Sequence, residues 1–79
     1  MNFETALRDA LAKSGKRNVI RQIDAEIGPV KQLILKRMER RVRTELGLGP
    51  NEKIDWSKID WAALLKTLLP ILLMILTML

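Results

Sequence analysis

The side chains able to do catalytic chemistry are scarce in this sequence. The chain has no histidine and no cysteine, so the usual nucleophile–base pairs are missing and a structural zinc site is disfavoured. Its two serines, Ser14 and Ser57, do not follow a strand, and Asp24 and Glu26 are spaced too closely to share a helix face. We therefore predict that the protein is not an enzyme and uses no cofactor, metal or small-molecule substrate.

The strongest chemical signal is positive charge. The segment KRMERRVR, residues 36–43, supplies a candidate basic patch made of Lys36, Arg37, Arg40, Arg41 and Arg43. Three interpretations are open: a solvated helix face with internal ion pairs to Glu39 and Glu45, attraction to anionic lipid head groups, or contact with nucleic-acid phosphates. We expect membrane lipid as a partner. Nucleic acid is not favoured, because no aromatic residue lies among the arginines.

Hydrophobic periodicity predicts an all-α fold in which short amphipathic helices position these charges. Apolar residues at helical spacing predict a first helix over residues 3–13, with Asn2 as its N-cap and Gly15 at its end. A second helix is predicted over residues 18–27, with Asn18 as its cap.

A third helix is predicted over residues 29–46, and it carries the basic patch. Gly28 would cap this helix and Pro29 would be its first residue, since proline pre-sets φ there and loses no useful donor. The alternative is one kinked helix, because the apolar spacing continues straight across Gly28 and Pro29. Gly47 predicts the end of the helix.

Charge and hydrophobicity divide the chain into unlike parts. Residues 1–50 carry a net charge of +5, whereas residues 51–79 carry none. We therefore predict a basic amphipathic helical head over residues 1–46, a Gly/Pro linker over residues 47–54 and a hydrophobic C-terminal helix within residues 55–79.

The hydrophobic C-terminal helix is predicted to cover about residues 57–79. Its most apolar part, residues 61–79, has nineteen residues, and as a helix it would span ~28 Å, close to the ~30 Å hydrocarbon core of a bilayer. This length predicts a tail anchor, a single transmembrane helix with the head in the cytoplasm. Lys66 and Pro70 argue against it, and the alternative is a helix buried in protein contacts. The residues assigned to membrane or oligomer contacts are Leu64, Leu65, Leu68, Leu69, Leu72, Ile75, Leu76 and Leu79.

A duplicated motif, IDWSKIDW, marks the start of that helix at residues 54–61. Five residues separate the two positions of a hydrophobic staple. With Ser57 as N-cap, Trp56 would pack on Trp61 and Asp60 would complete a capping box. With Asp55 as N-cap, Ile54 and Ile59 would form the staple instead. We prefer the Ser57 register, which predicts that alanine at either tryptophan frays the helix equally.

Together these features predict a small, non-enzymatic, membrane-tethered structural or adaptor protein. Its basic head would self-associate as a homo-oligomer or dock on a larger protein partner. One alternative is a structural component of a large assembly such as a virus particle, with the hydrophobic helix buried in subunit contacts. A further alternative is a membrane-permeabilising protein of the lysis or toxin type.

Overall fold

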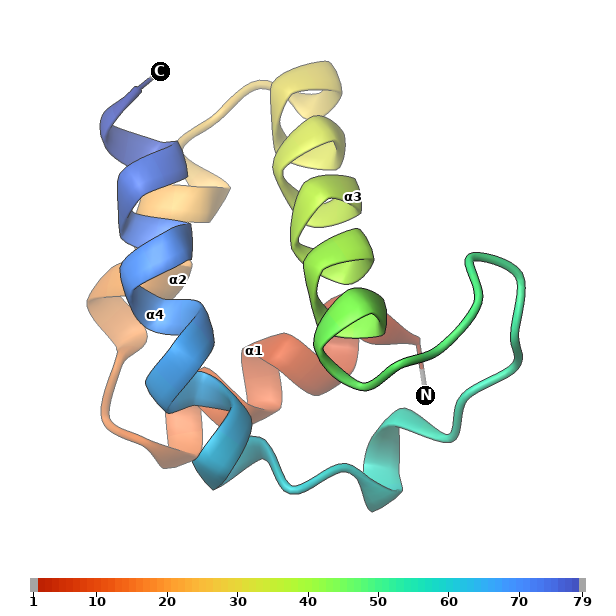
Figure 1. Cartoon of the computed structure of the whole chain (residues 1–79). Helices are drawn as coiled ribbons and strands as arrows, with labels where there is room; N and C mark the ends of the chain where they lie inside the picture. Colours follow the sequence, from red (N-terminus) through yellow and green to blue (C-terminus); the bar gives the residue numbers. More distant parts are fainter. Residues whose placement is uncertain (1, 79) are drawn as a thin grey trace.

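All regular secondary structure in the described part of this chain is helical. In the computed structural model, which describes residues 2–78, they pack into a compact globule (Figure 1). The α-helices are α1 (Phe3–Lys13), α2 (Arg17–Asp24), α3 (Gly28–Glu45) and α4 (Trp61–Thr77), and a short 3-10 helix, η1 (Trp56–Lys58), precedes α4. The prediction of an all-α fold is confirmed.

Helix α1 begins and ends as its sequence predicts. The backbone N–H of Thr5 donates a 2.8 Å hydrogen bond to the side-chain oxygen of Asn2, the N-cap. At the other end Gly15 takes a φ of +72°, which lets the N–H of Lys16 reach the carbonyl of Leu11 at 2.8 Å. The apolar stripe of α1 is buried along its whole length.

A break, and not a kink, separates α2 from α3. Helix α2 ends at Asp24, three residues earlier than predicted, and Lys16 rather than Asn18 is its N-cap. Ile27 then adopts an extended conformation, with ψ at 156°, so α3 starts at Gly28. Ile27 changes the direction of the chain. The apolar residues of α2 and α3 therefore belong to two separate helices, although their spacing in the sequence is also that of one continuous helix.

The predicted glycine end of α3 is confirmed. Gly47 has a φ of +69°, and the N–H of Leu48 donates a 2.8 Å hydrogen bond to the carbonyl of Arg43. An L-residue pays a steric cost in this conformation, whereas glycine does not. The chain therefore leaves α3 at a fixed angle and turns back beside it (Figure 1).

The duplicated IDW motif encodes two helix starts. Asp55 accepts a 3.1 Å hydrogen bond from the N–H of Ser57 and caps η1, and Asp60 accepts a 3.3 Å bond from the N–H of Ala63 and caps α4. Ile59 between them is extended, so η1 does not continue into α4. Ser57 is not the cap of the long helix, and α4 begins at Trp61 instead of residue 57.

One hydrophobic core joins the predicted head to the C-terminal helix. Helix α4 contacts α1, α2 and α3, and it runs antiparallel to α3 (Figure 1). The buried side chains that α4 contributes to the core are Leu64, Leu65, Leu68 and Leu72.

The prediction of a transmembrane tail anchor is wrong. Helix α4 has 17 residues, a length of ~26 Å. Within residues 2–78, no helix combines the length and apolar character that crossing a bilayer requires. The predicted localisation, a C-terminal segment in the membrane with the head in the cytoplasm, depended on this anchor and is wrong as well. The core-facing leucines of α4, which suggested an anchor, pack instead against the apolar residues of α1, α2 and α3.

Candidate functional site

The solvent-facing side of α3 carries several positively charged side chains. Because Ile34, Leu35, Met38 and Val42 point into the core, residues at helical spacing on the opposite side face solvent. We call these residues the α3 outward face. They are all exposed, and they are Leu33, Lys36, Arg37, Arg40 and Thr44.

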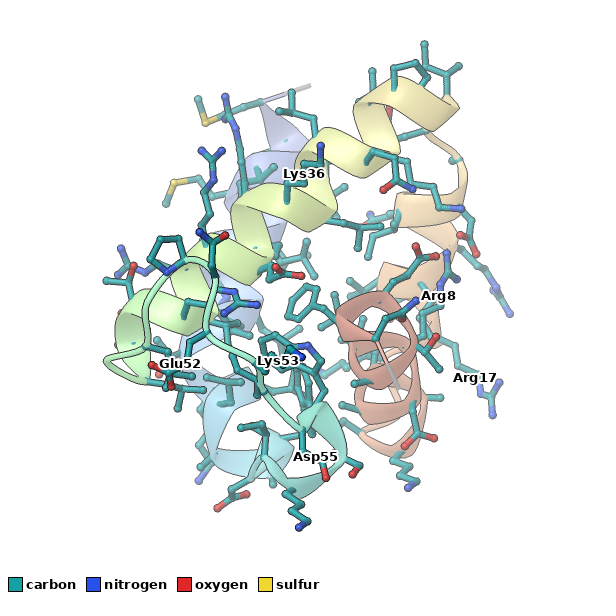
Figure 2. The ribbon with its side chains drawn as sticks, turned by 90° about the vertical axis from the view of Figure 1, so that its right-hand side faces the viewer. Arg8, Arg17, Lys36, Glu52, Lys53 and Asp55 are labelled. Carbon is teal, nitrogen blue, oxygen red and sulfur yellow. The ribbon has the colours of Figure 1, made fainter. Side chains whose placement is uncertain are left out.

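Three cations of the α3 outward face form no ion pair within the described part of the chain. Lys36, Arg37 and Arg40 make no ion pair with any residue between 2 and 78. Figure 2 shows Lys36 extending from α3 into solvent. Arg41 differs, since its guanidinium lies 3.1 Å from the carboxylate of Glu45, as its i,i+4 spacing predicts.

Arg43, the fifth residue of the predicted patch, has a structural role, because it contacts the loop after α3. Its Nη1 donates to the backbone carbonyls of Gly49 at 3.1 Å and Glu52 at 2.6 Å. Its Nε lies 3.3 Å from Glu39, and its guanidinium carbon lies 5.8 Å from the centre of the Trp56 ring. Only 14% of the side chain is exposed. Arg43 therefore fastens the loop after α3 and is not free to bind a partner.

A shallow groove of about 520 Å³ extends the α3 outward face toward this loop. Leu48 and Pro50 form an apolar wall, and Lys36 and Arg40 lie on the helix side. The full lining is Lys36, Glu39, Arg40, Arg43, Thr44, Leu48, Pro50 and Asn51. The face thus combines unpaired positive charge with apolar contact area.

The two tryptophans belong to an aromatic cluster inside the molecule. The ring of Trp56 meets that of Phe3 edge-on at 5.0 Å, and the ring of Trp61 lies 6.0 Å from Phe3 and 6.3 Å from Trp56. The predicted helix-start residues Trp56 and Trp61 are therefore brought together, with Asp60 as the cap. Ser57 stays exposed, and its hydroxyl donates to Asp55.

The apolar residues of α4 divide between two sides. Leu69, Ile75 and Leu76 are half-buried beside the four core leucines, and Leu79 lies outside the described residues. Leu73, Met74 and Met78 point away from the core, with exposed fractions of 42%, 59% and 77%. Sequence analysis did not separate these three, because apolar residues occupy every side of this helix.

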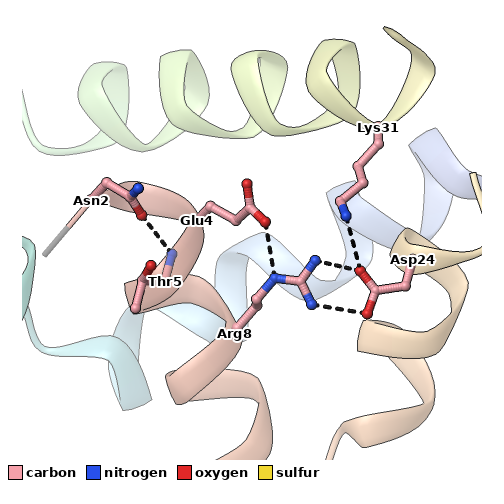
Figure 3. Close-up of polar contacts among 6 residues, drawn as sticks. All are labelled: Asn2, Glu4, Thr5, Arg8, Asp24 and Lys31. Atoms are coloured by element: carbon pink, nitrogen blue, oxygen red, sulfur yellow. Dashed lines mark hydrogen bonds and ion pairs between the residues drawn. The ribbon is translucent and has the colours of Figure 1, made fainter. Parts of the chain in front are cut away.

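An ion-pair cluster links α1, α2 and α3 (Figure 3). The guanidinium of Arg8 makes paired hydrogen bonds with Asp24 and lies 3.1 Å from Glu4, while Lys31 Nζ lies 3.3 Å from Asp24. Hydrogen bonding from Arg8 lowers the pKa of Asp24 to about 2, and Lys31 acts in the same direction. Sequence analysis missed this cluster, because Arg8 and Asp24 are sixteen residues apart.

A second carboxylate is perturbed at the start of η1. Hydrogen bonds from the hydroxyl and the backbone N–H of Ser57 lower the pKa of Asp55 below its usual value. The perturbation follows from helix capping, because the same carboxylate accepts the Ser57 N–H at the start of η1. It stabilises the charged cap.

Comparisons with known proteins identify no relative of this chain. No protein-family model matches the chain, and no curated protein or solved structure matches it significantly.

Proposed function

We propose that this protein is a non-enzymatic adaptor that binds an acidic protein partner through the α3 outward face. The observation that carries the proposal is that three exposed cations, Lys36, Arg37 and Arg40, form no ion pair among residues 2–78. Most of the carboxylates in the chain are already engaged by other cations, so these three are available to a partner.

The composition of the face favours a protein partner over nucleic acid. Leu33 lies on the same side of α3 with 48% of its surface exposed, and Leu48 and Pro50 line the adjoining groove. An acidic amphipathic helix supplies both carboxylates for the cations and apolar side chains for Leu33 and the groove wall.

A fluorescence anisotropy titration tests this proposal. The probe is a labelled peptide in which glutamates and leucines recur at helical spacing, and a labelled DNA duplex and vesicles containing phosphatidylserine serve as competing probes. We expect the peptide to bind, and we expect the triple variant Lys36→Gln, Arg37→Gln, Arg40→Gln to weaken that binding at least about tenfold.

The chain offers a control with the same change in charge. Lys16, Arg17 and Arg21 also make no ion pair with residues 2–78, and they lie on and beside α2. Replacing all three by glutamine should leave peptide binding nearly unchanged. Equal losses in both triple variants would mean that net charge alone attracts the peptide, and would refute the proposal. Tighter binding of the duplex or the vesicles would also refute it.

A structural subunit of a larger assembly is the second candidate function. The observation in its favour is the exposed apolar side of α4, where Leu73, Met74 and Met78 face solvent. Co-purification of the protein with a large particle in fixed stoichiometry, with these methionines protected from oxidation, would support this function over a free adaptor.

A further inference from the structure

The exposed side of α4 carries a regular stripe that the core does not use. Lys66, Pro70, Leu73 and Thr77 follow a 4-3-4 spacing and are all exposed. We call these four residues the α4 stripe, and Met74 flanks it. Such spacing places side chains in one line along a helix, which is the arrangement that lets two helices pack side by side.

The charges around the α4 stripe are few and lie at its two ends. Lys66 is the single charged residue of α4, and it makes no ion pair with any residue between 2 and 78. At the other end, Glu26 lines a depression of about 240 Å³ together with Leu73 and Thr77, and it is also unpaired among these residues. Eleven helical residues, or ~16 Å, separate Lys66 from Thr77.

We propose that a second copy of this chain docks antiparallel on the α4 stripe. A twofold axis near residues 71 and 72 would place Lys66 of each copy opposite Thr77 of the other, beside the unpaired Glu26 of that copy. The same axis brings Leu73 of one copy next to Pro70 of the other. Every contact is then made twice, as a closed twofold interface requires.

The charges identify a second copy as the occupant. An opposite charge stands at each end of the stripe, with apolar residues between them, so the stripe is complementary to itself when reversed. A partner with acidic charge would be drawn to the groups of three unpaired cations on α3 and at α2, whereas the α4 stripe has one cation. The stripe is one helix wide, so we expect the interface to bury less than the ~800 Å² per partner of a standard interface, and the dimer to be weak and to depend on concentration.

Sedimentation equilibrium across micromolar to millimolar concentrations tests the proposal. The wild type should shift from monomer to dimer. Met74→Glu should stay monomeric with unchanged helix content, because Met74 is 59% exposed and contributes little to the core. Lys66→Glu should raise the dissociation constant about tenfold, and Lys66→Glu combined with Glu26→Lys should restore it by re-forming both ion pairs with reversed sign.

Lys53→Glu provides the control with the same change in charge, since Lys53 is exposed and belongs to the loop between α3 and η1. It should dimerise as the wild type does. A wild type that stays monomeric at every concentration would overturn the proposal, as would failure of the double charge reversal to restore dimerisation. Growth beyond dimer would overturn the twofold arrangement in favour of an open contact. None of these variants alters Lys36, Arg37 or Arg40, so the dimer proposal and the adaptor proposal are tested independently.

Discussion

The indole N–H of Trp61 donates a 2.9 Å hydrogen bond to the backbone carbonyl of Trp56. This bond joins the first residue of α4 to the first residue of η1, so the two copies of the IDW motif hold each other in place. The rings of both residues also lie against Phe3. The start of α4 is therefore fixed by contacts inside the protein, and the tryptophans need no membrane interface to account for them.

The two tryptophans should contribute unequally to stability. Trp56→Ala removes a buried ring that contacts Phe3 and Arg43, and we expect it to lower the unfolding free energy by about 3–5 kcal/mol. Trp61→Phe keeps an aromatic ring but removes the hydrogen bond, and should cost about 0.5–1.5 kcal/mol. Urea denaturation followed by far-UV circular dichroism measures both. Trp61→Ala removes a half-buried ring and should cost less than Trp56→Ala. Equal losses from the two alanine variants would favour the Ser57 register over this structure.

The cap of α4 should reside in Asp60 and not in Ser57. Asp60→Ala removes the acceptor for the N–H of Ala63 and should lower the unfolding free energy by about 1 kcal/mol. Ser57→Ala is the matched control three residues earlier, and we expect a smaller effect because its hydroxyl bonds only to Asp55. Thermal unfolding of the two variants distinguishes the caps, and a larger loss from Ser57→Ala would contradict the observed helix start.

The Arg8–Asp24–Lys31 cluster should make stability sensitive to acid. The pKa of Asp24 is about 2 when folded, below the value of ~3.9 for a free side chain. The stabilisation is therefore complete above about pH 4 and is lost as the pH falls toward 2, where the folded protein must also take up the proton. Asp24→Asn should flatten the decline in unfolding free energy over this range. Glu52→Gln, which alters a carboxylate outside the ion pairs, should leave the decline unchanged.

The two sides of α4 should respond differently to truncation. Leu68→Ala opens a cavity among fully buried side chains and should lower the unfolding free energy by about 2–5 kcal/mol. Leu73→Ala, on the exposed side of the same helix, should cost well under half as much at low protein concentration. Chemical denaturation without detergent measures the difference. Equal small losses would mean that α4 does not pack on α1 to α3 as observed.

Local signals in the sequence were sufficient for part of this fold. The cap at Asn2, the stripe of α1 and the glycine end at Gly47 each depend on residues a few positions apart. The pairs Glu39–Arg43 and Arg41–Glu45 follow from i,i+4 spacing in the same way. These features do not require knowledge of what lies across the core.

The features that sequence analysis missed depend on distant contacts. Local spacing pairs Arg43 with Glu39, but it does not reveal that the returning loop places two backbone carbonyls against the Arg43 guanidinium. Likewise, a helix that is apolar on every side does not reveal which side will be covered. The bilayer prediction for α4 failed for this reason, because α1, α2 and α3 supply the apolar environment that its leucines need.

The contact of Phe3 with Trp56 also sets an order of events during synthesis. These residues lie more than fifty positions apart, so the contact cannot form until the ribosome has made the chain at least as far as Trp56. Until then the buried stripe of α1 has neither the tryptophans nor α4 to cover it. We expect the helices to acquire fixed packing in one late cooperative step, and the nascent chain to present an apolar surface to chaperones before that step.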